Sequence, residues 1–414
     1  MDTKGKTMQK TIMIIGAAQE HCIGIDTAHS MGYKVFVTDG NPSSPGFALA
    51  DAYAVASTYD FEATLAAARK YISSGGKIDG VMTLASDVPY TVAFVAQHLK
   101  LTGIGLEPAE NASEKVRMKD LFAQHKIPMP FYKGVKSAEE IIHALPKTGL
   151  PIVVKPVDSR GARGVQLIRD SAQISSSFQI AMQYSASKRV MFEQYLPGPQ
   201  LSTEGFMVHG HAYIPAIFDR NYEFLDKYAP YIVEDGGEMP SIYSKQYKDE
   251  VHSVMEKSAI ALGIETGVIK GDLVIHEGKV KVIEIAARLS GGFFGTVATP
   301  VSCGVDLVKA NILLSLGEPL TSEMLQHSTG RAAAIRFAFP SPGRIVKISG
   351  IEKISNDPAC KYAHVFAKPG DIIEPITNHP GRPAVVVCDG KNLQEAVSNA
   401  KRLIGYLEWE LTYA

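Results

Sequence analysis

GDLVIHEGKVKVIEIAAR, residues Gly271–Arg288, is the stretch of sequence that decides the fold. Two apolar runs flank His-Glu-Gly, and a short loop that ends in glycine is a common connection in β-hairpins. A three-residue loop pairs Asp272 with Val282. Because side chains alternate along a strand, Asp272 and Glu284 then lie on one face as diagonal neighbours. The sequence therefore predicts two antiparallel strands that carry two carboxylates on one face.

Paired carboxylates at this spacing are typical of a site for a hard divalent cation. Diagonal neighbours lie about 7–8 Å apart along the backbone, and magnesium is often held by one or two carboxylates together with nucleotide phosphates. Glu284 lies in an apolar run, so we expect it to be buried, and a buried acid needs a partner or a metal. The alternative is a surface hairpin with an unrelated acid on each strand. We predict that Asp272 and Glu284 bind a metal, a hypothesis that depends on the three-residue loop, since a two-residue turn places them on opposite faces.

A second motif, Val153–Val165, reads VVKPVDSRGARGV and predicts an anion-binding loop. A strand that ends near Lys155 places an ammonium group beside a turn, and Gly161 and Gly164 let backbone amides approach an anion closely. Arg160 adds positive charge. The GxxxxGK[ST] pattern of a Walker loop is absent. The alternative is a solvated hairpin with surface arginines.

Two shorter motifs add candidate binding groups. Phe192–Leu196, FEQYL, places an acid and a strand end where backbone groups could bind the edge of an adenine, with plain structure as the alternative. Arg288–Phe294, RLSGGFF, combines an arginine, which can clamp an anion with two hydrogen bonds, and glycines that allow close approach. A glycine turn after a strand is the alternative for this second motif.

The first hundred residues alternate strands and helices, which predicts a parallel sheet that binds ligands at the carboxyl ends of its strands. After the first strand the sequence GAAQEHCIG lacks the GxGxxG of a dinucleotide-binding site. Asp39, at the end of the second strand, is by itself weak evidence for such a site. Residues 131–200 read as a small α+β unit, and the chain beyond about 330 is rich in short strands and turns. The expected domains are 1–112, 113–334 with a lid subdomain at about 128–197, and 335–414.

Composition and charge exclude several classes of function. A net charge of -1 over 414 residues gives no general attraction to nucleic acids or anionic membranes, so we expect neither as a partner. No apolar run approaches the roughly 18 residues of a membrane-spanning helix. The four cysteines are scattered without a CxxC pair, which argues against a zinc site or a disulfide framework and predicts a cytoplasmic location.

The order of these motifs along the chain resembles the ATP-grasp superfamily of carboxylate–amine ligases over about residues 10 to 411. The series runs from SEKVRMK around Lys115 through the lysine and glycine loop, EQYL, and STE at 202–204 to Asp272 and EIAAR at 284–288. It looks most like the L-amino acid (dipeptide) ligase branch. The resemblance implies an α/β and α+β fold with an N-terminal parallel α/β domain, a two-lobed ATP-grasp clamp and a small β-rich C-terminal domain.

The resemblance also implies roles for individual residues, with Lys155 and Arg288 as catalytic groups and magnesium on Asp272 and Glu284. The residues expected to bind ATP are Lys115, Lys155, Ser159, Arg160, Gly161, Gly164, Glu193, Tyr195, Leu196 and Glu204. Those expected to hold the substrate or acyl phosphate are Arg288, Ser290, Gly291 and Gly292. Asp272 stands where the family usually has Glu, and Ala286 where it often has Asn, so a second magnesium would have fewer protein ligands.

The implied reaction activates a carboxylate as an acyl phosphate and joins it to an amine. ATP and Mg²⁺ are the implied cofactors, amino acids the implied substrates, and a homodimer is a family expectation. The alternative is a purine-pathway or carboxylase-type enzyme that acts on formate, glycine or bicarbonate. Two other classes stay open: a non-catalytic ATP-binding module, which predicts binding without turnover, and a nicotinamide dehydrogenase, which predicts NAD binding at residues 16–24.

Overall fold

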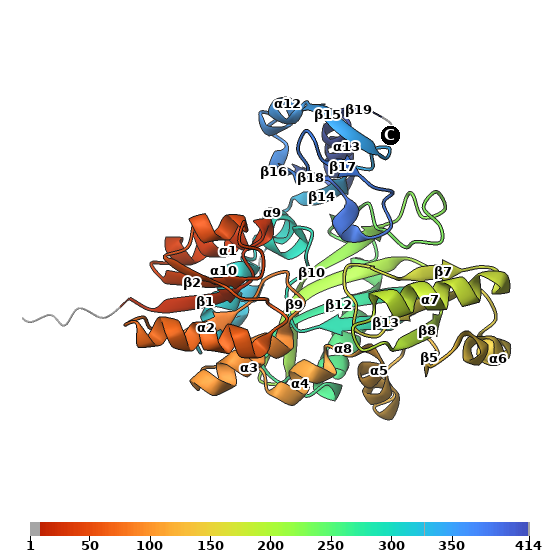
Figure 1. The fold of residues 1–414 in the computed structure, drawn as a ribbon, viewed down its shortest axis with the longest axis horizontal. Coiled ribbons are helices and arrows are strands. Elements are labelled where there is room, and N and C mark those ends of the chain that lie inside the picture. Colours follow the sequence, from red (N-terminus) through yellow and green to blue (C-terminus); the bar gives the residue numbers. More distant parts are fainter. Residues whose placement is uncertain (1–8, 327, 413–414) are drawn as a thin grey trace, which may run out of the picture.

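The structure is a computed structural model that describes residues 9–326 and 328–412. Figure 1 shows the N-terminal region in red and orange at the left, the β5–β8 unit at the right and the C-terminal region in blue at the top. The predicted mixed fold class is confirmed, because a parallel sheet begins the chain and the later sheets are antiparallel.

The N-terminal region contains a parallel sheet in the order β3-β2-β1-β4. β1 is apolar at four of its five positions and fully buried, as expected for a central parallel strand. The edge strand β3 lies outside the predicted elements, because its four residues, AYAV, form a short apolar run without a polar–apolar alternation that would mark a strand. The elements are β1 (Thr11–Ile15), α1 (Gln19–Ser30), β2 (Lys34–Asp39), β3 (Ala52–Val55), α2 (Phe61–Ser73), β4 (Gly80–Met82), α3 (Pro89–Leu99) and α4 (Leu106–Asn111).

An eight-stranded antiparallel sheet crosses the middle of the molecule in the order β13-β12-β9-β10-β11-β14-β18-β16. β14 spans the predicted domain boundary between residues 334 and 335, so the central and C-terminal regions share this sheet. Helix α8 (Ser244–Ala261) packs against β10 and β13. The strands are β9 (Gln200–Val208), β10 (His211–Asn221), β11 (Gly236–Met239), β12 (Gly267–His276), β13 (Lys279–Ala286), β14 (Ala332–Phe337), β16 (Cys360–Val365) and β18 (Ala384–Gly390).

One hydrophobic core joins this sheet to the N-terminal region. Ile14 and Val37 of the parallel sheet share it with Phe206 and Phe218 of the central sheet and with Leu307. Because protein interiors are close-packed, this continuous core fixes the N-terminal loops against the central sheet. The helices of this part are α9 (Thr299–Cys303), α10 (Leu307–Ser315) and α11 (Ser322–Leu325).

The β5–β8 unit is a small antiparallel sheet with its own hydrophobic core and the strand order β5-β8-β6-β7. Helix α5 (Lys115–Gln124) precedes it, and the segment 127–131 connects that helix to β5. The elements of the unit are β5 (Tyr132–Val135), α6 (Ala138–Thr148), β6 (Ile152–Pro156), β7 (Gln166–Ile168), α7 (Ile174–Tyr184) and β8 (Val190–Gln194).

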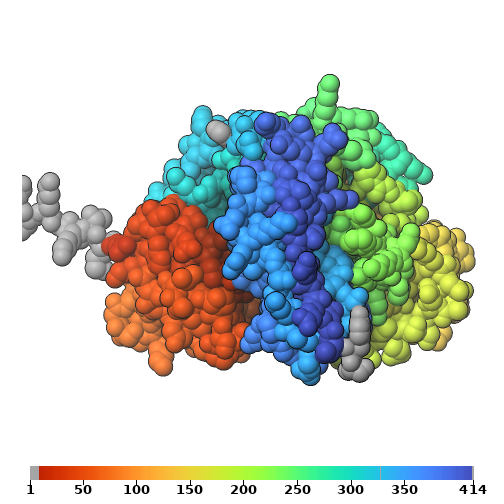
Figure 2. Space-filling model, turned by 90° about the horizontal axis from the view of Figure 1, so that it is seen from above, coloured from red at the N-terminus to blue at the C-terminus, as the bar shows by residue number. Residues whose placement is uncertain are grey.

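The C-terminal region adds a three-stranded sheet, β17-β15-β19, and helix α13, which packs on β14 and β18. Seen from above in Figure 2, this blue region lies between the red N-terminal region and the green and yellow parts. Across the described residues no single helix is long and apolar enough to cross a membrane, while one bent pair, Phe294–Cys303 with Leu307–Ser315, passes that test only when joined. The elements are β15 (Gly343–Ser349), α12 (Ile351–Ser355), β17 (Ile372–Ile373), α13 (Leu393–Ile404) and β19 (Glu408–Thr412).

The hairpin turn differs from the prediction. His276 pairs with Lys279, so the loop has two residues, and both have positive φ, as in a type I′ turn. Such a turn alone would place Asp272 and Glu284 on opposite faces. A β-bulge follows Asp272, where Ile283 is an extra residue in β13, and it brings Asp272 directly opposite Glu284. The three-residue loop was therefore wrong, and the bulge restores the shared face.

Candidate active site

A cavity of about 740 Å³ opens where the N-terminal region, the β5–β8 unit, the central sheet and the C-terminal region meet. Residues from every predicted motif line it: Lys115, Lys155, Ser159, Arg160, Gly161, Glu193, Tyr195, Leu196, Asp272, Glu284, Arg288, Ser290, Gly291 and Gly292. Gly164 and Glu204 are not among the lining residues. Gly164 has a φ of +73°, and an added Cβ would lie 2.9 Å from the Tyr184 side chain, so this glycine serves the turn itself.

One part of the cavity has apolar walls. Val153 and Leu196 come from the β5–β8 unit and its outgoing strand end, and Val274 and Ile283 come from the hairpin. Tyr195 lies beside them. Apolar walls next to a strand end, where backbone polar groups are available, suit a planar aromatic base.

A buried carboxylate holds two lysines beside these walls. The Glu193 carboxylate accepts a hydrogen bond from Lys155 Nζ at 2.6 Å, and its other oxygen lies 2.9 Å from Lys119 Nζ. Burial alone would raise the pKa of Glu193, but the two lysines outweigh it and lower the pKa to about 2. The Glu193 side chain therefore positions lysines. Sequence reasoning missed Lys119, although it lies four residues after Lys115 on α5 and hence on the same helix face.

The two hairpin carboxylates each face cations. Asp272 lies 2.9 Å from Arg220 Nη1 and also pairs with Lys270. Glu284 lies 3.6 Å from Lys115 Nζ and is half-buried rather than buried, because it faces the cavity. Burial would raise the pKa of Asp272, but Arg220 and then Lys270 hold that pKa well below its usual range. Asp272 therefore offers charged oxygens to the cavity, and Glu284 lies opposite it in the hairpin.

These carboxylates fit a magnesium ion that is shared with phosphate oxygens. Asp272 Oδ1 pairs electrostatically with Arg220 but has no aligned hydrogen-bond donor, so a lone pair is available to a metal. Ala286, opposite Lys270 in the register, brings no ligand. Within residues 9–326 and 328–412 no cluster of three or more His, Cys, Asp or Glu side chains could hold an ion alone. Two carboxylates could supply only part of a coordination shell, which is the usual arrangement for magnesium in proteins.

The glycine loop, residues 158–164, lies along the cavity and is held by its neighbours. Lys115 Nζ donates to the Ser159 carbonyl oxygen at 2.9 Å. The backbone N–H of His379, in the C-terminal region, donates to the Gly161 carbonyl oxygen at 3.0 Å. The loop therefore contacts both α5 and the C-terminal region while it borders the lysines.

Asp87, at the carboxyl end of β4, lies between two arginines of the predicted site. Its carboxylate is 3.3 Å from Arg288 Nε and 3.4 Å from Arg160 Nε, and the Arg160 guanidinium also lies over the Tyr59 ring at 4.8 Å. Burial would raise the pKa of Asp87, but Arg288 and Arg160 lower it below its usual value. Sequence reasoning missed Asp87, although ligands bind at the carboxyl ends of parallel strands.

A second N-terminal acid, Glu20, holds the glycine segment that follows Arg288. It accepts hydrogen bonds from the amides of Gly292 at 3.0 Å and Phe293 at 2.9 Å and from the Thr296 hydroxyl at 2.9 Å. Gly292 and Phe293 both have positive φ, and this backbone turns consecutive amides toward one anion. Burial raises the pKa of Glu20 to about 7 despite these bonds. Sequence reasoning missed Glu20, because its partners lie 272 and 273 residues away along the chain.

Glu204 contacts the same glycine segment from β9. It is fully buried on β9, and one oxygen accepts a hydrogen bond from the Ser290 amide at 3.0 Å. Burial raises the pKa of Glu204 to about 7, an effect only partly offset by Ser290. Glu204 therefore contacts the segment after Arg288 rather than the open cavity.

The C-terminal region contributes Arg382 to a charged cluster with the central region, and Phe366 to the edge of the cavity. Glu234 accepts from Arg220 at 2.7 Å and lies 3.3 Å from Arg382 Nη1. Burial would raise the pKa of Glu234, but these arginines lower it to about 2. Phe366 lines the cavity with 47% of its surface exposed, and its ring lies 6.4 Å from that of Phe293.

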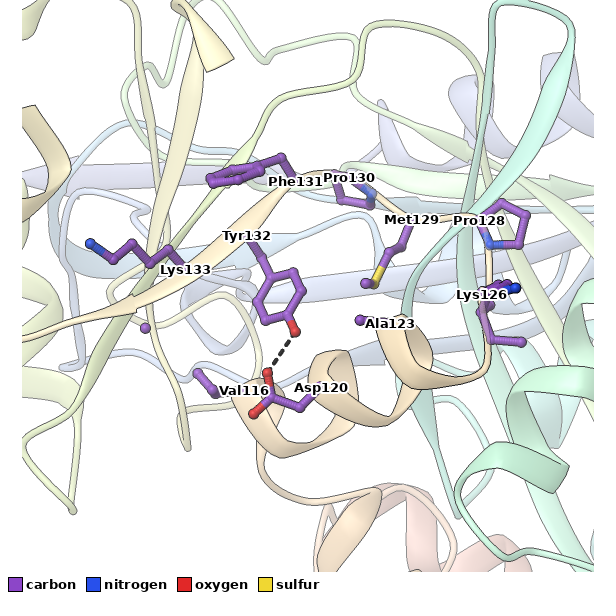
Figure 3. Close-up of a pocket in the computed structure, with 12 residues that line it drawn as sticks. Val116, Asp120, Ala123, Lys126, Pro128, Met129, Pro130, Phe131, Tyr132 and Lys133 are labelled. Carbon is purple, nitrogen blue, oxygen red and sulfur yellow. Dashed lines mark hydrogen bonds between the residues drawn. The ribbon is translucent and has the colours of Figure 1, made fainter. Parts of the chain in front are cut away.

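A separate cavity of about 600 Å³ lies where α5 meets β5 (Figure 3). The Tyr132 hydroxyl donates to Asp120 at 2.6 Å across it. The wall is completed by Lys126, Pro128, Met129, Pro130 and Phe131, among others. This cavity borders the connection into the β5–β8 unit and shares no lining residue with the larger one.

Family models match two parts of the chain. Residues 113–291 match the phosphoribosylglycinamide synthetase ATP-grasp (A) domain, and residues 336–412 match the L-amino acid ligase C-terminal domain 2. The first match contains the lysines and the hairpin, and the second contains β16, β18 and α13.

Solved structures and protein sequences that are similar to this chain include ligases and a carboxylase domain. The L-amino acid ligase from Bacillus licheniformis superposes with a TM-score of 0.82 at 21% identity, over 98% of this chain and 99% of that one. The biotin carboxylase domain of a 2-oxoglutarate carboxylase from Hydrogenobacter thermophilus, solved with MgADP, has a TM-score of 0.74 at 16% identity, over 97% and 91%. A D-alanine–D-alanine ligase from Gloeobacter violaceus is 28% identical over 198 residues, which are 45% of this chain and 62% of that protein.

The matched models, the shared fold and the cavity that gathers the lysines with the hairpin carboxylates lead to one conclusion. This chain carries a match to an ATP-grasp domain within residues 113–291 and to an L-amino acid ligase C-terminal domain within residues 336–412, and these matches indicate an ATP-dependent ligase.

Proposed function

We propose that this protein binds ATP with magnesium, activates a carboxylate as an acyl phosphate and joins it to an amine, with amino acids as both substrates. One observation carries the proposal: Lys155, the Asp272–Glu284 pair and Arg288 line a single cavity that also has apolar walls. The likeness to an L-amino acid ligase over 98% of the chain supports amino acids as the substrate class.

In this proposal the apolar walls around Leu196 hold the adenine, and Lys115 and Lys155 bind the phosphates. Asp272 and Glu284 would hold magnesium, which would supply positive charge beside the phosphates. Bound magnesium neutralises phosphate charge and so favours transfer of the terminal phosphoryl group. Glu193 keeps Lys155 in place, because a buried ion pair at 2.6 Å restricts the lysine side chain.

The protein groups act mainly by position and charge. Arg288 orients the substrate carboxylate, whose oxygen attacks the terminal phosphorus while the bond to ADP breaks. Lys115, Lys155 and Lys270 stabilise the charge that develops on the transferred group. The glycine loop keeps water away from the acyl phosphate. The amine then attacks the acyl carbon, a C–N bond forms, and inorganic phosphate leaves.

The test is a screen of amino-acid pairs for phosphate release from ATP, with mass detection of the product. A pair that stimulates release and yields a dipeptide is the expected result. Stimulation by formate and an amine nucleotide, but by no amino-acid pair, would instead favour a purine-pathway type of enzyme. ATP binding without turnover on any pair would favour a non-catalytic module.

A further inference from the structure

Arg160 of the glycine loop contacts the N-terminal region. Its guanidinium lies between the Tyr59 ring at 4.8 Å and the Asp87 carboxylate at 3.4 Å. Tyr59 follows β3, Asp87 follows β4, and Arg160 belongs to the loop between β6 and β7. An arginine that stacks on an aromatic ring and faces a carboxylate combines cation–π and ionic attraction. This geometry docks the loop on the N-terminal region.

The same carboxylate also holds the substrate-side arginine. Asp87 Oδ1 lies 3.3 Å from Arg288 Nε, while Asp87 Oδ2 faces Arg160. The side chain of Asp87 is only 15% exposed, as is that of Arg288. Arg288 Nη1 is fixed further by the Leu289 carbonyl oxygen at 2.9 Å. One largely buried carboxylate therefore forms ion pairs with two guanidinium groups from different parts of the chain.

The charge balance of this trio depends on the position of the loop. With Arg160 docked, two guanidinium groups share the Asp87 carboxylate, so this part of the cavity carries one more positive charge than it does with the loop displaced. With the loop displaced, Asp87 neutralises Arg288 alone. Docking of the loop therefore increases the attraction of this part of the cavity for an anion such as a carboxylate or an acyl phosphate.

We propose that Asp87 is a positioning residue that couples docking of the glycine loop to the orientation and effective charge of Arg288, with Tyr59 as the second half of the docking site. The loop-docking part is independent of the reaction, whereas the effect on the substrate rests on the proposed function. Asp87 acts through the two arginines.

The experiment compares Asp87→Asn, Tyr59→Leu and Tyr59→Phe with Asp26→Asn, a matched substitution at an exposed position of the same region. Limited trypsin digestion of the intact protein, with and without MgADP, reports the loop through cleavage after Arg160 and Arg163, identified by mass spectrometry. Steady-state phosphate release with the best amino-acid pair reports kcat and KM. Tyr59 is 57% exposed, so its substitution leaves the core intact.

We expect loop cleavage to rise about tenfold in Asp87→Asn and in Tyr59→Leu, because docking no longer opposes local opening. Tyr59→Phe keeps the ring and stays at the wild-type rate. Asp87→Asn also raises the KM of the carboxylate substrate about tenfold while the KM of ATP changes less than about twofold. Tyr59→Leu, which leaves Asp87 on Arg288, shows the smaller kinetic effect.

The proposal is overturned if Asp87→Asn and Tyr59→Leu are cleaved and turn over like Asp26→Asn. Equal increases in the KM of ATP and of the carboxylate would also overturn it, because they indicate general damage to the cavity. If no pair stimulates turnover in the wild-type protein, the proposed function has failed, and the digestion alone decides whether the loop docks on Tyr59 and Asp87.

Discussion

Glu193→Gln tests whether the buried carboxylate holds the two lysines in place. The substitution keeps the shape of the side chain and removes its charge, so Lys119 and Lys155 lose their shared partner. The pKa of Glu193 falls from an ordinary 4.5 to about 2, which corresponds to about 3 kcal/mol of favourable interaction with the folded protein. Loss of one member of a buried ion pair typically costs about 3–5 kcal/mol.

Hydrogen exchange of the β6 and β8 amides measures this effect locally. A loss of about 3 kcal/mol makes their exchange roughly 100-fold faster, if exchange proceeds through cooperative opening of the β5–β8 unit. Glu140→Gln, the same substitution at a partly exposed position of the same unit, is the matched control. Phosphate release by Glu193→Gln should fall together with protection, because Lys155 is no longer held.

The stability difference between wild type and Glu193→Gln should also depend on pH. A carboxyl group whose pKa is lowered on folding stabilises the protein above its unfolded pKa, and this stabilisation is lost as the pH falls through the folded value. The stability difference between wild type and Glu193→Gln should therefore be full above about pH 4.5 and shrink toward pH 2. Exchange in β6 and β8 that matches the Glu140→Gln control would refute the reasoning.

Three further predictions concern the cavity. Glu284→Ala should lower phosphate release about 100-fold and raise the magnesium concentration needed for half-maximal rate, since one of two opposed carboxylates is lost; unchanged kinetics would contradict the hairpin argument. Glu204→Gln keeps a hydrogen-bond acceptor for Ser290 and removes a buried acid whose pKa is raised to about 7. Because the stabilisation from a raised pKa is lost as the pH rises through it, this variant should melt about 5 °C above wild type at pH 8 and close to it at pH 5. A thermal shift that is the same at both pH values would argue against a buried acid there. Phe366→Ala should raise the KM of bulky apolar amino acids about tenfold and leave that of alanine within about twofold, because the exposed ring lines the cavity; equal effects on both would exclude substrate contact.

Much of the site could be predicted from local sequence. Lys155 and Gly161 belong to one strand-and-loop motif, and Arg288 belongs to the glycine segment that follows β13. Side-chain alternation in strands and the conformational freedom of glycine are local properties, so a single stretch of sequence carries them. The parallel N-terminal sheet could be predicted for the same reason, because its buried strands are continuous apolar runs.

The partners of these residues could not be predicted in this way. Asp87, Glu20 and Arg220 reach the site from elements that lie far apart along the chain, and no spacing marks them. Lys119 lies one helical turn after Lys115, but its partner Glu193 comes from β8. The side-chain partners of Glu193 and Glu204 could not be predicted for the same reason, because the lysines and the Ser290 amide that they bind come from other elements.

The hairpin separates what the sequence determines from what only the tertiary structure decides. The sequence by itself determined that two strands with a glycine turn carry Asp272 and Glu284. Only the tertiary structure decided their register, because β12 is hydrogen-bonded to β9 along most of its length while β13 is a sheet edge that can accommodate a bulge. That one extra residue places both carboxylates in the cavity despite a two-residue turn. Packing between distant elements therefore fixed the geometry of a site whose chemical groups were already present in the sequence.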